Sequence, residues 1–274
     1  MPVALQLSFA AGVAVVLAAL VSPVAHLGEE LFVTHVAQHI LLADIGALLI
    51  VLGVTGPVVA PLLRIRFVDR LRVLAHPAAA LPLWALNLYL WHIPPLQGGV
   101  LDSGALHALM HGAFLATGVL VWMPLLGPLP KPDWFGDLAK LLYIVGVRFS
   151  GALLANVFLW SEVVFYPAYG AGEADWGIEP LRDQGAAGAA MMLEESILTI
   201  CLFGWIFIEA ARHGEERQRL LELAEARGIR LDEKRVRRAV AAGRGRELEQ
   251  RLLAGAAPTD VFPAATRPVS RSVE

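Results

Sequence analysis

The stretch from Leu31 to Gly53, LFVTHVAQHILLADIGALLIVLG, constrains the fold most strongly. Its 23 residues are mostly apolar, and a helix of that length, rising about 1.5 Å per residue, spans the roughly 30 Å hydrocarbon layer of a bilayer. His35 and His39 lie four residues apart within it, so their imidazoles share one face of the helix. Ionisable side chains are costly inside a bilayer and generally face a bundle interior, a water-filled cavity or a ligand. The segment therefore predicts a membrane helix that carries a site.

Five further apolar runs indicate an integral membrane protein. The 274 residues are 57% hydrophobic and 17% charged, which is more apolar than ordinary soluble proteins. A single cysteine, Cys201, excludes an internal disulfide and any cysteine-rich metal motif. The runs predict an all-α fold, a six-helix transmembrane bundle over residues 1–210. Its predicted spans are Val3–Val21, Leu31–Gly53, Pro77–Ile93, Gly104–Leu126, Leu138–Trp160 and Ala186–Ala210.

The distribution of basic residues predicts the orientation of the bundle. The loops after the second and fourth predicted spans are basic, the opposite loops are mostly acidic, and residues 211–274 hold fourteen of the 22 lysines and arginines. By the positive-inside rule, both termini lie in the cytoplasm. Residues 211–274 are predicted to form a basic cytoplasmic tail, helical to about Ala226 and from Asp232 to Leu253, and disordered after about residue 255. Its arginines are typical of anchors near anionic lipid, with partner docking as the alternative, and no nucleic-acid partner is expected.

Five of the eight histidines converge on the outer side of this topology. They belong to the second span, to the end of the third and to the start of the fourth: His35, His39, His92, His107 and His111. Met191 and Met192 lie in the outer half of the sixth span. Imidazole and thioether donors without thiolate suit copper best, and a haem held by one histidine from each of two helices is the alternative. Any one of these histidines alone is more typical of a hydrogen-bonded interfacial residue than of a metal ligand.

Charged residues also occur within the predicted spans. Asp44 lies in the second span, Arg148 in the fifth, and Glu194 and Glu195 in the sixth. Unpaired burial would be costly, so we expect a buried ion pair between Arg148 and a glutamate that locks the fifth and sixth spans together. A proton or ion pathway is the alternative interpretation.

Several motifs in this chain are similar to those of one known family. They are SP at residues 22–23, the stretch that starts at Leu31, WHIPP from Trp91, HALMHGAFLATGVLVWMPLLGP from His107, YPAY from Tyr166 and LRDQGAAG from Leu181. In order, spacing and topology, residues 5–210 resemble the caa3-type cytochrome c oxidase assembly factors (CtaG) of bacterial plasma membranes.

The resemblance implies a multi-pass plasma-membrane protein that helps a haem-copper oxidase to mature. It implies copper handling for the metal centres, without catalytic turnover, and oxidase subunits or a copper donor as partners beside the lipid bilayer. The characteristic histidines of the family fall on the five named above, and its acidic outer-loop pair falls on Asp183 and Gln184, which would orient ring nitrogens. The chain departs from the family pattern at two places. Met110 stands where the family commonly has an acidic residue. The aromatic residue that the family often has shortly after WHxP is missing, and Gln97 lies in that neighbourhood. A thioether at Met110 would favour Cu(I).

The sequence therefore predicts a copper ion bound by His35, His39, His107 and His111 near the extracytoplasmic face. His92 and Met110 are further possible donors. Three other interpretations stay open: a bis-histidine haem protein, a structural chaperone of oxidase subunits without metal, and a copper transporter. The transporter is the weakest of these because the inner halves of the spans are largely apolar.

Overall fold

The computed structural model describes residues 2–241 and 243–254, and all secondary structure within these ranges is helical. The disorder predicted after about residue 255 lies outside the described residues. The chain divides into two compact units, Met1–Leu202 and Phe203–Glu274. In chain order the helices up to the fourth predicted span are α1 (Val3–Val21), α2 (Pro23–Glu30), α3 (Phe32–His39), the π-helix η1 (Ile40–Gly46), α4 (Ala47–Gly53), α5 (Gly56–Leu62), α6 (Arg66–Leu71), the 3-10 helix η2 (Arg72–Ala75), α7 (Pro77–Trp91), α8 (Pro94–Asp102) and α9 (Gly104–Leu126). The remaining ones are α10 (Asp137–Trp160), the 3-10 helix η3 (Pro167–Tyr169), α11 (Gly170–Trp176), α12 (Pro180–Glu225), α13 (Glu233–Ala241) and α14 (Gly245–Leu253).

Five stretches of the described residues are long and apolar enough to cross a membrane: α1, the continuous run α3–η1–α4, α9, α10 and α12. They contain the predicted spans one, two, four, five and six. The predicted third span is α7, which has 15 residues and ends at Trp91. Pro94 and Pro95 follow, and a proline disfavours helical backbone at the residue before it. Counted with the preceding helices α6 and η2, from which it is bent by 80°, α7 would give a sixth span. Six spans and cytoplasmic termini stay predictions.

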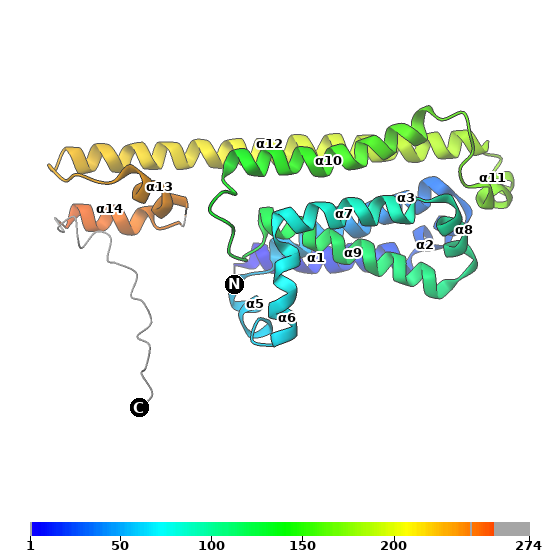
Figure 1. Ribbon diagram of the computed structural model, residues 1–274, viewed down its shortest axis with the longest axis horizontal. Helices are drawn as coiled ribbons and strands as arrows, with labels where there is room; N and C mark the ends of the chain where they lie inside the picture. The colour runs from blue at the N-terminus through cyan, green and yellow to red at the C-terminus, as the bar shows by residue number, and fades with distance from the viewer. Residues whose placement is uncertain (1, 242, 255–274) are drawn as a thin grey trace. The chain divides into compact units, whose positions relative to one another are not determined.

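The second predicted span packs closely between its neighbours (Figure 1). It contacts α1 on one side, where Gly12 and Gly53 leave no room for a side chain. On the other side it contacts α9, where a Cβ added at Gly118 would lie 2.5 Å from the Ala43 carbonyl oxygen. The Trp122 indole Nε1–H donates a 3.0 Å hydrogen bond to the same carbonyl. Small residues allow such close approaches between membrane helices.

The middle of this span is a π-helix, with backbone bonds from i to i+5, over Ile40–Gly46. Single π turns inside α-helices are uncommon and often lie at functional sites. Here the wide turn begins directly after His39 and contains Asp44. Both residues belong to the site described below.

The second unit has its own small core. Residues from the C-terminal part of α12, from α13 and from α14 bury apolar side chains against one another, among them Leu220, Val236 and Leu252. The tail helix predicted from Asp232 to Leu253 is divided in two by Gly243, whose φ of 68° is left-handed and therefore incompatible with a continuing helix. α12 runs through the boundary at residue 210 without a break.

We predict that Gly118→Ala lowers the stability of the protein. The added methyl group would meet the Ala43 backbone, which can move only if α9 and η1 separate, and overpacking of this kind costs about 1–3 kcal/mol. The thermal unfolding midpoint of the purified protein in detergent measures the change. Gly112→Ala on the same helix is the matched control, because nothing lies within 4 Å of its added Cβ. Equal midpoints for both variants would contradict the packing described.

Candidate functional site

The five histidines singled out in the sequence lie together. We call them the histidine cluster: His35 and His39 on α3, His92 directly after α7, and His107 and His111 on α9. Within each helix the paired rings have centroids 4.4 Å apart. Between helices, centroids lie 5.7 Å apart for His35 with His107 and for His39 with His111, and 6.0 Å apart for His39 with His92. The imidazoles of the second and fourth predicted spans therefore face each other.

Several ring nitrogens of the cluster are buried without a hydrogen-bond partner among the described residues. His35 is 0% exposed and His39 5%, and both nitrogens of His39 are unpartnered. The others are Nδ1 of His35 and Nε2 of His107 and of His111. Buried polar atoms in folded proteins nearly always have a partner. The unpartnered nitrogens of His39, His107 and His111 therefore fit a metal ion.

The cluster is not arranged as a finished coordination sphere. Among the described residues, no three His, Cys, Asp or Glu side chains stand in positions that would hold a metal ion. Ligation would need nitrogens about 2 Å from one shared ion. Binding an ion here therefore requires rotation of the rings about their side-chain torsions.

Two hydrogen bonds define the orientation of individual rings. The Nε2 amide of Gln97 lies 3.0 Å from His35 Nε2 and also donates to the Tyr169 hydroxyl at 3.1 Å. With the amide nitrogen as donor, His35 Nε2 is the acceptor and the neutral ring carries its proton on Nδ1. His92 Nδ1–H donates to the Leu88 carbonyl oxygen at 2.7 Å, which leaves its Nε2 lone pair unprotonated. Sequence reasoning noted Gln97 only as a departure from the family pattern and missed its contact with His35.

Asp183 and Gln184 act on the backbone rather than on ring nitrogens. The Asp183 carboxylate accepts hydrogen bonds from Phe32 N at 2.6 Å and Val33 N at 3.0 Å, and it thereby caps the first turn of α3. The Gln184 side chain binds the outer loop through Phe165 N and the Val163 carbonyl oxygen. Within the described part of the chain, these hydrogen bonds reach backbone groups and not a histidine ring. They position the helix that carries His35 and His39.

Arg148 on α10 is surrounded by three carboxylates. Its guanidinium lies 2.7 Å from Asp44 on η1, and 3.0 Å and 3.2 Å from Glu194 and Glu195 on α12. We call these four residues the carboxylate cluster. Its side chains are 12% exposed or less, and the guanidinium also lies over the Trp122 ring. The structure thus brings the charged residues of three predicted spans into one network.

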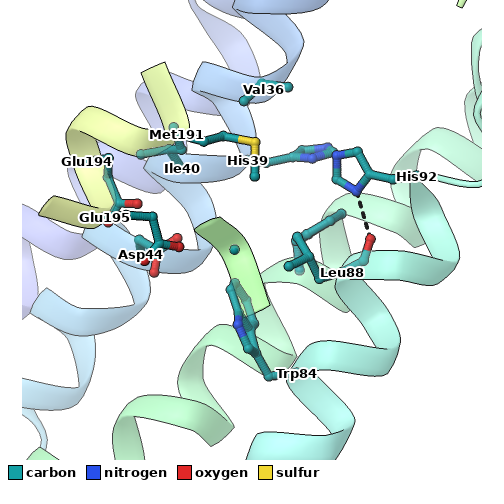
Figure 2. Close-up of a pocket in the computed structure, with 12 residues that line it drawn as sticks. Val36, His39, Ile40, Asp44, Trp84, Leu88, His92, Met191, Glu194 and Glu195 are labelled. Atoms are coloured by element: carbon teal, nitrogen blue, oxygen red, sulfur yellow. Dashed lines mark hydrogen bonds between the residues drawn. The ribbon is translucent and has the colours of Figure 1, made fainter. Parts of the chain in front are cut away.

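A cavity of about 30 Å³ lies between the two clusters. Figure 2 shows His39 and His92 on one side of it and Asp44, Glu194 and Glu195 on another, with the Met191 sulfur nearby. The other predicted thioether donors lie elsewhere. Met110 on α9 is completely buried and does not line the cavity, and Met192 has its sulfur 3.5 Å from the Asn156 amide nitrogen.

Fold and site together define a helical membrane protein with a histidine cluster next to buried carboxylates. The profile of the family described as cytochrome c oxidase caa3 assembly factor matches residues 1–213. The chain therefore belongs to the caa3 cytochrome c oxidase assembly factor family. Comparison with curated proteins and with solved structures gave no match.

We predict that Arg148→Gln destabilises the protein by about 3–5 kcal/mol, because three carboxylates would stay buried without their guanidinium. The thermal unfolding midpoint in detergent reports the loss. As a control, Lys140→Gln on the same helix breaks a partly exposed pair with Asp137, which is worth about 1 kcal/mol or less. Similar midpoints for the two variants would show that the network adds nothing to stability.

Glu173 on α11 gives a prediction for the pH dependence of stability. Burial, together with the nearby Asp183 carboxylate, raises the pKa of Glu173 above its usual value. A raised pKa means that the folded state favours the neutral carboxyl group. The protein therefore keeps its full stability below the unfolded pKa of Glu173 and loses stability as the pH rises through the folded pKa. Glu173→Gln should therefore unfold at a higher temperature than wild type, by a margin that grows with pH. The exposed variant Glu179→Gln should show no such growth, and a constant margin for Glu173→Gln would contradict the prediction.

Proposed function

We propose that this protein is an assembly factor that binds copper at the histidine cluster and supports maturation of the metal centres of a haem-copper cytochrome c oxidase. The observation that carries the proposal is the convergence of imidazoles from α3 and α9, several of whose nitrogens are buried and unpartnered among the described residues. Copper is the cargo of this protein in our proposal, not a resident cofactor. Family membership supports the role in oxidase assembly.

The donor set supports copper as the metal. His35, His39, His107 and His111 are the proposed ligands, and His92 offers its unprotonated Nε2. Imidazole with thioether and without thiolate suits copper in either oxidation state. Binding through His35 would require the ion to replace the Gln97 amide at Nε2, while Asp183 would hold the first turn of α3.

The role we propose is non-catalytic and takes place in the bacterial plasma membrane. Both termini would lie in the cytoplasm, as the positive-inside rule predicts, with the histidine cluster near the extracytoplasmic face. From there the ion could pass sideways to an oxidase subunit, or arrive from a copper donor, without crossing the membrane.

A haem is less well supported by the geometry. Sites for cofactors of that size are usually clefts of about 300–1,000 Å³, whereas the cavity beside His39 and His92 measures about 30 Å³. A structural chaperone without metal is also less well supported, because histidines that only link helices would have their nitrogens paired.

Metal analysis of the purified protein tests the proposal. After anaerobic loading with copper and removal of unbound ion, we expect bound copper in wild type and background copper in a His35→Ala/His39→Ala variant. His76→Ala is the matched control, since His76 lies outside the cluster and its Nδ1 accepts from Ala78 N at the start of α7. Equal copper in the double variant and wild type would refute the ligand assignment. A Soret band in the absorption spectrum would favour haem, and oxidase assembly unaffected by the double variant would favour the structural chaperone.

A further inference from the structure

The cavity between the histidine cluster and the carboxylate cluster has the size of a single bound species. A volume of about 30 Å³ is large enough to hold a water molecule or one small cation. Its wall has two chemically different sides. His39 and His92 supply imidazole, while Asp44, Glu194 and Glu195 supply carboxylate.

The carboxylate side of the cavity holds more acidic side chains than basic ones. Three carboxylates face one guanidinium, and the remaining polar contact of Arg148 is with the Trp122 ring. A buried carboxyl group without a counter-charge of its own favours its neutral form, and a cation that enters the cavity would favour the ionised form and be stabilised by it. Because the carboxylates already bind Arg148, they would act on a neighbouring cation through their field rather than as its ligands.

The other side offers two donors, an imidazole and a thioether. Both ring nitrogens of His39 are buried and unpartnered among the described residues, although the ring itself is held by stacking on Phe114 at 4.0 Å between centroids. Met191 lines the cavity and is 7% exposed. Nitrogen and thioether sulfur together are a soft donor pair, which selects a soft cation over Mg²⁺ or Ca²⁺.

We propose that this cavity is a second, inner cation position, in which His39 and Met191 bind a monovalent copper ion and the acidic side chains around Arg148 stabilise it. The proposal rests on the copper-binding function proposed above and extends it inward from the other histidines. His39 belongs to both positions, since it faces His35 and His111 on one side and the cavity on the other. The ion can thus move inward by exchanging ligands at His39.

Gly151 on α10 keeps this position open. It lines the cavity, and a Cβ added there would collide with the Glu195 carboxylate. An alanine would therefore fill the cavity or push the carboxylate from its wall without removing a donor. The variant Gly151→Ala therefore tests whether copper binding needs the volume of the cavity, because His39 and Met191 are unchanged in it.

X-ray absorption at the copper edge tests the inner position in the full-length protein loaded anaerobically with Cu(I). We expect a sulfur neighbour of copper in wild type and none in Met191→Leu, with Cu(I) affinity, measured against a Cu(I) chelator, lowered more than about 10-fold. Met192→Leu is the matched control, because Met192 does not line the cavity and should keep both sulfur and affinity. Glu195→Gln and Gly151→Ala should lower affinity by about 10- to 100-fold with every donor in place.

The His107→Ala/His111→Ala variant distinguishes failure of this proposal from failure of the proposed function. If the inner position exists, this variant keeps a sulfur-bound copper ion. If wild type binds copper through nitrogen alone and Met191→Leu is indistinguishable from it, the inner position is refuted and the copper-binding function stands. If wild type binds no Cu(I), both are refuted.

Discussion

The single guanidinium of Arg148 is the interaction on which the arrangement of the site depends. It joins η1, α10 and α12, which lie far apart in the sequence, through carboxylates that could not stay buried without it. By holding η1 it also sets the rotation of the second predicted span, and with it the direction of His39. The orientation of His39 thus depends on an ion-pair network in the middle of the bundle.

The outer end of the same span is held by hydrogen bonds. The Asp183 carboxylate caps α3 through two backbone N–H groups, and Gln97 connects His35 to Tyr169. α2, α8 and α11 lie at this end of the first unit (Figure 1). The helix that carries His35 and His39 is therefore held by the ion-pair network at one end and by polar contacts at the other, while both nitrogens of His39 have no partner among the described residues.

Much of the architecture could be predicted from the sequence, because length and hydrophobicity determine which segments are membrane helices. The spacing of His35 with His39 and of His107 with His111 indicated shared faces. The partners of Gln97 and Asp183 could not be predicted, since Tyr169 is 72 residues from Gln97 and Phe32 is 151 from Asp183. The cavity beside Met191 likewise depends on the rotation of three helices, which hydrophobicity does not determine.

The wide turn over Ile40–Gly46 has a consequence for how one helix serves two sides of the bundle. In a regular α-helix, residues five apart differ in direction by about 140°, so His39 and Asp44 would point to different neighbours. A π turn holds more residues per turn than an α turn, so the directions of His39 and Asp44 differ by less, and both residues line the same cavity. The π turn also rotates α4 relative to α3 about the helix axis. As a result α4 packs against α1, while α3 directs His35 and His39 toward His107 and His111 on α9.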